Sequence, residues 1–211
     1  GGSDRLYGNN GNDTIHGNTG NDVIYGGWGK DFVSGDSDND WVHGGGNNDS
    51  VLGGIGDDHV YGEGGNDYLD GGPGSDDIRG GSGNDRLFGG DSYDLLWGGD
   101  GVDRMTGGAN YDRFIYRSPE ESVDNHPDVI VDFKPGVDII DLSPIDAYDP
   151  DDGVNDQFEF SYLDEFYPGT VTVSNDNYGN TIVRANNDWG SGFMEIHLLG
   201  VSNLSVDDFF L

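Results

Sequence analysis

The sequence predicts an all-β protein in which a parallel β-solenoid of nonapeptide repeats is followed by a β-rich cap. An aspartate recurs every nine residues from position 4 to position 112, and an apolar residue stands two positions after each one. A glycine stands five positions before each aspartate from Asp13 onward. Three columns that keep one register over more than half of the chain indicate a structural repeat. The aspartates are Asp4, Asp13, Asp22, Asp31, Asp40, Asp49, Asp58, Asp67, Asp76, Asp85, Asp94, Asp103 and Asp112.

Each repeat combines a glycine-rich turn with a short strand. Glycine at the first and second places, and glycine or asparagine at the fourth, allows positive φ angles and a tight turn with its carbonyls directed inward. The next residues, as in Arg86-Leu87-Phe88, predict a strand about 10 Å long in which only the middle side chain faces the interior. Two repeats make one coil, and stacked coils form two parallel sheets around one apolar column. The column is Leu6, Ile15, Ile24, Val33, Val42, Val51, Val60, Leu69, Ile78, Leu87, Leu96, Met105 and Phe114.

The large negative charge of the chain predicts a bound cation. The 41 acidic residues against 9 basic ones give a formal charge of −32, which opposes a compact state. Stacking places alternate aspartates in two columns, with neighbours roughly 4.8 Å apart. Coordination by carboxylates and carbonyls favours calcium over magnesium, and the gaps within the columns would admit up to about 11 ions. Binding would then be coupled to folding. The alternative, a solvated acidic surface, gives no reason for a nine-residue step.

Other features restrict the class of protein. The absence of cysteine excludes disulfides and thiolate sites. No apolar run has the length of a membrane span, and the acidity argues against a nucleic-acid partner. The opening GGSDRLY matches only the last seven places of the repeat, so we expect the chain to be a piece of a longer protein.

The unit GGxGxDxUx, in which U is apolar, resembles the repeats-in-toxin (RTX) calcium-binding nonapeptide. The resemblance implies a right-handed parallel β-roll. One loop contributes its aspartate with the carbonyls of its second and fourth residues, and the loop one coil away contributes its aspartate with those of its first and third. On this chain it implies that Asp31 and Asp49, and likewise Asp67 and Asp85, are partners across a calcium ion.

Some repeats depart from this pattern. Asparagine and aspartate tolerate the left-handed conformation better than serine. We therefore expect the sites around Ser92 and Asn110, and those at the N-terminal end, to be the least regular. The fourth place holds Asp38, Asn47, Ser92 and Asn110 instead of glycine, and the second holds Asn9, Asn18, Asp36 and Glu63.

After Tyr116 the composition changes to longer, alternating apolar runs, which predicts a β-rich cap over 117–211 on a roll over 1–116. The cap would cover the last open coil. The stretch DVIVDFKPGVDIIDLSPID and the terminal DDFFL are similar to the C-terminal region of serralysin-type metalloproteases. That resemblance implies a type I secretion signal, although a plain final strand also explains the ending. The signal would include Asp207, Asp208, Phe209, Phe210 and Leu211.

No catalytic constellation is visible. The five histidines form no HExxH zinc helix, and neither a GxSxG elbow nor a phosphate-binding loop is present. The acidic stretch 149–159 lacks glycine at the sixth place and glutamate at the twelfth place of an EF-hand loop. We therefore expect a non-catalytic, calcium-binding C-terminal module of a secreted, extracellular protein. Its partners would be calcium, an upstream domain that carries any activity, and a type I secretion apparatus.

Aromatic residues on the outer face of one sheet indicate an alternative function. Exposed aromatic side chains invite a partner, which could be a polysaccharide, as in the repeat modules of alginate epimerases, or the upstream domain. The alternative is that aromatic and β-branched residues merely favour strands. The outward places of this sheet read Arg5 and Tyr7, Val23 and Tyr25, Trp41 and His43, His59 and Tyr61, Asp77 and Arg79, and Leu95 and Trp97.

Overall fold

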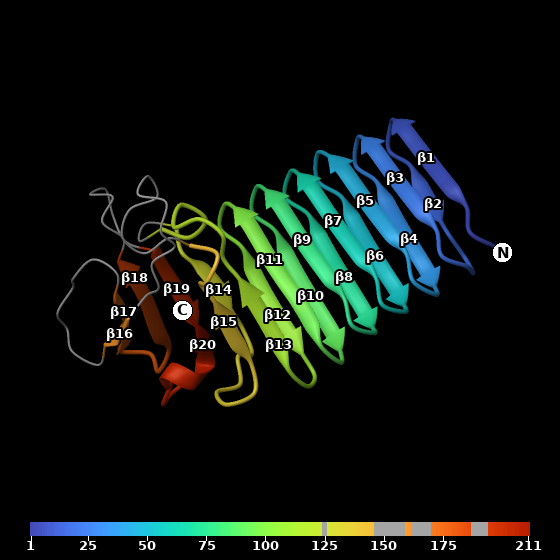
Figure 1. The fold of residues 1–211 in the computed structure, drawn as a ribbon. Coiled ribbons are helices and arrows are strands. Elements are labelled where there is room, and N and C mark those ends of the chain that lie inside the picture. The colour runs from blue at the N-terminus through green and yellow to red at the C-terminus, as the bar shows by residue number, and fades with distance from the viewer. Residues whose placement is uncertain (124–125, 146–158, 162–169, 187–193) are drawn as a thin grey trace, which may run out of the picture.

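The computed structural model describes residues 1–123, 126–145, 159–161, 170–186 and 194–211, which form two long β-sheets and one short 3-10 helix, η1 (Val206–Asp208) (Figure 1). The nine-stranded sheet runs in the order β1 (Arg5–Asn10), β3 (Val23–Trp28), β5 (Trp41–Gly46), β7 (His59–Gly64), β9 (Asp77–Ser82), β11 (Asp94–Asp100), β13 (Asp112–Ile115), β15 (Ile139–Asp141), β20 (Phe209–Phe210). The eleven-stranded sheet runs in the order β16 (Glu159–Ser161), β17 (Thr170–Asn175), β18 (Thr181–Asn186), β19 (Met194–Leu198), β14 (Asp128–Ile130), β12 (Arg104–Gly108), β10 (Arg86–Asp91), β8 (Tyr68–Pro73), β6 (Ser50–Ile55), β4 (Phe32–Ser37), β2 (Thr14–His16). The described residues contain no helix long and apolar enough to cross a membrane.

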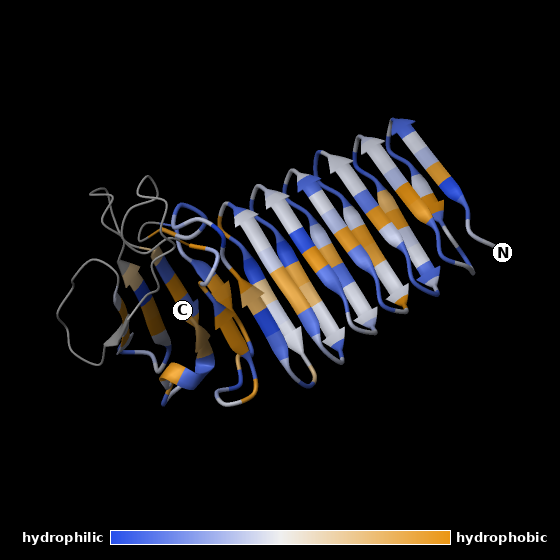
Figure 2. Ribbon diagram, viewed as in Figure 1, coloured by the Kyte–Doolittle hydropathy of each residue, from blue (hydrophilic) through white to orange (hydrophobic). Residues whose placement is uncertain are grey.

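The roll repeats every two nonapeptides, as the sequence predicts. Val42 of β5 pairs in parallel with Val60 of β7, and Val60 pairs with Ile78 of β9. The apolar column from Ile24 to Phe114 has no exposed surface, and Figure 2 shows it as an orange band that crosses successive strands. Leu6 and Ile15, at the N-terminal end, are only partly buried because no earlier coil covers them. The predicted all-β, parallel solenoid is therefore confirmed.

The turns differ from the prediction in two respects. Strands such as β10 have six residues because they continue through the first three places of the next repeat, two glycines and the residue after them. Positive φ angles occur at the second and fourth places but not at the first, so the prediction was wrong there. A Cβ on the first-place Gly62 would lie 2.5 Å from Asp67 Oδ2 and 2.6 Å from the Gly80 carbonyl oxygen. Glycine is needed at this place because two oxygens occupy the space beside it.

The irregular repeats keep the same backbone. All eight non-glycine residues at the second and fourth places have positive φ angles, including Glu63 at 74° and Ser92 at 86°. Positive φ is strained for L-residues other than asparagine and aspartate, so the roll imposes this conformation on them through the neighbouring coils.

Beyond Tyr116 both sheets continue. β14 pairs in parallel with β12 and β15 with β13, which places Ile130 beside Met105 and Ile140 beside Phe114. β17, β18 and β19 then form antiparallel pairs that extend one sheet. The division of the chain at 116 and 117 stays a prediction. Residues 149–158 of the acidic stretch lie outside the described residues.

Candidate metal centre

Two ladders of hydrogen bonds bring the predicted aspartates together. The backbone N–H of each aspartate donates to Oδ1 of the aspartate one coil later, as from Asp31 to Asp49 and from Asp67 to Asp85, both at 2.8 Å. The ladders run from Asp4 and Asp13 into the cap. The Asp13 column comprises Asp13, Asp31, Asp49, Asp67, Asp85 and Asp103, and the Asp4 column comprises Asp4, Asp22, Asp40, Asp58, Asp76, Asp94 and Asp112.

The second carboxylate oxygen is the chemically notable atom of each aspartate. In every column member except Asp4, Oδ2 is buried and has no hydrogen-bond partner. The column aspartates from Asp22 to Asp112 are at most 4% exposed, whereas Asp13 is half-buried and Asp4 is exposed. A buried polar atom without a partner costs roughly 1–3 kcal/mol, and more when it is charged. These oxygens therefore fit the ligands of a cation.

Burial raises the pKa of the column aspartates from Asp40 onward. The pKa is raised to about 8 for Asp76, to about 7 for Asp40 and Asp112, and to about 6 for Asp67 and Asp85. Desolvation is the main cause in each case, because burial penalises the charged form. For most of them, neighbours in the same column raise the pKa further. Without a cation, the roll thus holds many of its carboxylates in an unfavourable state at neutral pH.

A metal ion in the columns would need further oxygens from the loops. Among the described residues, no three histidine, aspartate or glutamate side chains converge so as to hold a metal ion by themselves. Two aspartates and the backbone carbonyls of two loops would have to share the coordination. At Gly62 a carboxylate oxygen and a carbonyl oxygen of the next coil flank the space that a Cβ would fill. A set made only of oxygen donors fits calcium.

Two further aspartates belong to the columns, and sequence reasoning missed them. Asp128 Oδ1 accepts the N–H of Asp103 at 2.8 Å, and Asp138 Oδ1 accepts that of Asp112 at 3.1 Å. Both carboxyls are buried. Each stands two positions before an apolar strand residue, as the repeat aspartates do, but 25 and 26 residues after its partner. The shared spacing of aspartate and apolar residue was the signal that could have found them.

The aromatic face forms one continuous stack. The ring centroids of Tyr7 and Tyr25 are 5.2 Å apart, and His43 lies 4.7 Å from both Tyr25 and Tyr61. The Arg79 guanidinium continues the stack, 5.4 Å from the Tyr61 ring. Tyr7 is exposed, whereas the inner members are half-buried because each ring covers the next.

The comparisons with known proteins agree with the repeat. Residues 7–42, 25–60, 43–78 and 79–114 match the family model of the RTX calcium-binding nonapeptide repeat in four copies. The chain belongs to this family. RTX nonapeptide repeats bind calcium, so the predicted family and its cofactor are confirmed, while the ligands and the number of ions stay predictions.

Solved structures and curated sequences complete the comparison. The solution structure of the AlgE6R3 subunit of the Azotobacter vinelandii mannuronan C5-epimerase is 29% identical, covers 83% of this chain and 80% of its own, and has a TM-score of 0.32. The solution structure of the AlgE6R2 subunit of that epimerase is 26% identical, and the match covers 80% of this chain and 90% of the subunit with a TM-score of 0.43. No curated protein sequence matches the chain.

Proposed function

We propose that the two aspartate columns bind calcium and that this binding folds the roll, so that the chain acts as a non-catalytic folding module of a secreted protein. The buried, unpaired Oδ2 of each column aspartate after Asp4 carries this proposal. Calcium supplies positive charge and accepts six to eight oxygens at flexible geometry. The unfolded chain has no preformed site, so the free energy of binding contributes directly to folding.

The ligands are the aspartates of both columns. Interior members have coils on both sides, whereas Asp4 is exposed and its second oxygen is not buried. Full occupancy of the gaps within the columns would be about 11 ions and would bring the formal charge from −32 to about −10. The self-repulsion of the chain would fall accordingly.

Export before folding follows from this dependence. Where calcium is scarce the chain stays unfolded and can pass a type I secretion channel, and it folds in the extracellular medium, where calcium modules of 10⁻⁴–10⁻³ M affinity are filled. In the folded protein, Phe209 and Phe210 form β20 beside β15, and Asp208 is buried. A signal in these terminal residues would therefore be read before the cap folds.

A calcium titration tests the proposal. The chain is treated with a chelator and followed by far-UV circular dichroism as calcium is added, with magnesium as the control. We expect β-structure to appear cooperatively with calcium and not with magnesium. A chain that shows β-structure in chelator, with a spectrum that does not change when calcium is added, would refute the coupling of binding to folding.

Binding of a polysaccharide is the second candidate function. Trp28 is 69% exposed and borders a pocket of about 450 Å³ that is also lined by Tyr25, His43 and Glu63. Trp41 is exposed on the same sheet. An indole at the rim of a pocket offers a flat face to a sugar ring. Loss of polymer binding in Trp28→Ala and Trp41→Ala, with calcium-dependent folding intact, would support this function, and unchanged binding would refute it.

A further inference from the structure

The cap extends each column by one aspartate, and the two extensions differ at the second carboxylate oxygen. In the Asp4 column, Asp138 Oδ2 accepts the backbone N–H of Lys134 at 2.7 Å. The Lys134 ammonium donates to the carbonyl oxygen of Gly108, the second residue of the last repeat loop. Both the carboxylate and this loop carbonyl therefore have partners from the chain itself. In the Asp13 column, Asp128 Oδ2 has no partner.

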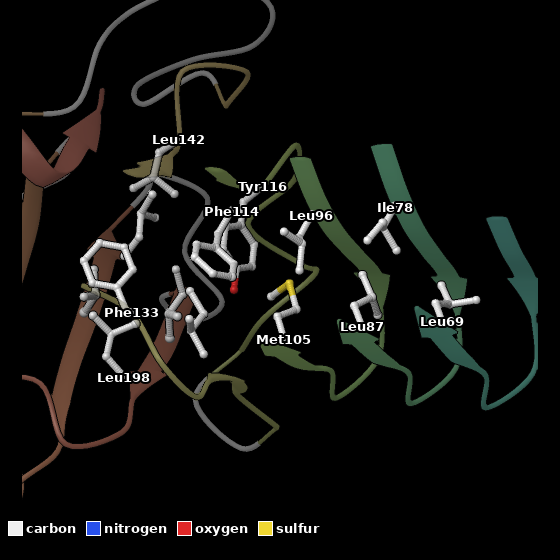
Figure 3. Packing of buried hydrophobic residues seen from close by; sticks show 14 of the residues in the cluster. Leu69, Ile78, Leu87, Leu96, Met105, Phe114, Tyr116, Phe133, Leu142 and Leu198 are labelled. Atoms are coloured by element: carbon white, nitrogen blue, oxygen red, sulfur yellow. The ribbon is translucent and has the colours of Figure 1, made fainter. Parts of the chain in front are cut away.

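The surroundings of Asp128 are rich in buried oxygens. Asp128 has no exposed surface, and Tyr116 and Asp103 are each 1% exposed. Asp103 Oδ2, Asp128 Oδ2 and the Tyr116 hydroxyl make no hydrogen bond of normal geometry, and the hydroxyl's one polar neighbour with an effect on its pKa through a hydrogen bond is the Asp128 carboxyl. Figure 3 shows Tyr116 among the core residues Leu96 and Phe114, at the junction of roll and cap.

Asp103 and Asp128 are joined by the hydrogen bond from the Asp103 N–H to Asp128 Oδ1 at 2.8 Å, and their charges act on the same buried region. Burial raises the pKa of Asp128 well above its ordinary value, and the charges of Asp103 and Glu121 raise it further. Burial likewise raises the pKa of Tyr116, followed by the charges of Asp128, Asp103 and Glu121. Three carboxyls and a phenol thus share one desolvated region, and none of these causes is a basic side chain.

We propose that one further calcium ion binds at the junction between Asp103 and Asp128, with the Tyr116 hydroxyl as a neutral oxygen ligand. This inference rests on the proposed function, because it assumes that the columns bind calcium. The equivalent position of the Asp4 column takes no ion, because Lys134 already supplies a positive charge and a backbone donor there. The junction ion joins the last coil of one side to the first strand of the cap.

A count of bound ions in two matched variants tests the site. Asp128→Asn and Asp138→Asn remove the same charge from equivalent places of the two columns. In equilibrium dialysis against radioactive calcium at saturation, we expect Asp128→Asn to bind one ion fewer than the unaltered chain and Asp138→Asn to bind the same number. If Asp128 stays protonated and binds no ion, Asp128→Asn will bind as many ions as the unaltered chain, and this result would overturn the inference. Equal losses in both variants would also overturn it.

The outcomes separate this inference from the proposed function. If the unaltered chain binds no calcium, the proposed function fails as well. If it binds calcium and Asp128→Asn binds as many ions, only the junction site fails. If Asp128→Asn does not fold, the unaltered chain is crystallised with terbium in place of calcium, and the anomalous scattering of terbium locates the bound ions. A peak between Asp103 and Asp128 supports the site, and peaks confined to the repeat loops overturn it.

Discussion

The roll and the cap both bury carboxylates, but they satisfy them by different means. In the roll, every aspartate from Asp13 to Asp112 in the two columns keeps one oxygen without a partner. In the cap, Asp141 pairs with Arg113 and accepts a hydrogen bond from the Ser143 hydroxyl. Glu195 forms an ion pair with Arg184 at 2.8 Å. Basic side chains of the chain thus neutralise these two carboxylates of the cap. The column aspartates of the roll have no such partner, and we propose that calcium neutralises them.

The cause of this difference is periodicity. In a stack of identical units, each side chain has the same kind of side chain above and below it. This arrangement favours the apolar column, in which Val42, Val60 and Ile78 pack on one another. In the two columns the same arrangement places carboxylates next to carboxylates, so the aspartate of one coil cannot be the counter-ion of the aspartate in the next coil. An irregular segment such as the cap can place unlike residues together.

The largest expected effect that tests this comparison is that of pH, because it acts on all interior aspartates at once. For the column aspartates from Asp40 onward, the pKa values in the metal-free fold lie at about 6 to 8, against an ordinary value of 3.8. Between pH 4 and pH 8 the metal-free fold therefore binds more protons than the unfolded chain, and its stability falls as pH rises. Calcium must displace these protons.

Calcium displaces these protons only from molecules that are already folded. The unfolded chain has lost its carboxyl protons well below pH 6, so we expect the calcium midpoint of folding not to rise from pH 8 to pH 6. Circular dichroism titrations at the two pH values measure it. In chelator, the chain should hold more β-structure at pH 5 than at pH 8. Equal β-structure in chelator at pH 5 and pH 8 would show that burial does not raise the pKa of these carboxyls, and a higher midpoint at pH 6 would contradict the expected linkage.

A smaller effect is expected from one interior aspartate. Asp67 is 3% exposed and has coils on both sides, whereas Asp4 is exposed at the N-terminal end. Asp67→Asn keeps the hydrogen bond at Oδ1 and removes one charged ligand. Its calcium midpoint should rise by roughly three- to tenfold, about 1 kcal/mol, and that of Asp4→Asn by less than twofold. Equal shifts in the two variants would contradict the ranking of interior over terminal sites.

The sequence predicts the regular part of the molecule and not the irregular part. A fixed step of nine places Asp31 beside Asp49 and buries Ile78, because stacking converts sequence spacing directly into spatial register. The need for glycine at Gly62 depends on a carboxylate oxygen of Asp67 in the same repeat and on the Gly80 carbonyl oxygen of the next coil, which only the folded backbone brings near. Asp128 joins its column across an irregular segment, so no period could place it.

The smallest effect on calcium binding is expected at the contact between roll and cap. Arg113 pairs with the buried Asp141 and lies 4.7 Å from the Phe210 ring. Since this carboxylate is neutralised by the chain itself, Arg113→Gln should leave the calcium midpoint within twofold while lowering the free energy of unfolding by about 1 kcal/mol. Arg86→Gln, at an exposed arginine of the roll, is the control and should change stability by less than about 0.5 kcal/mol. Urea denaturation in saturating calcium measures both. A shift of the calcium midpoint in Arg113→Gln as large as that in Asp67→Asn would mean that the cap, like the roll, depends on the ion for its charge balance.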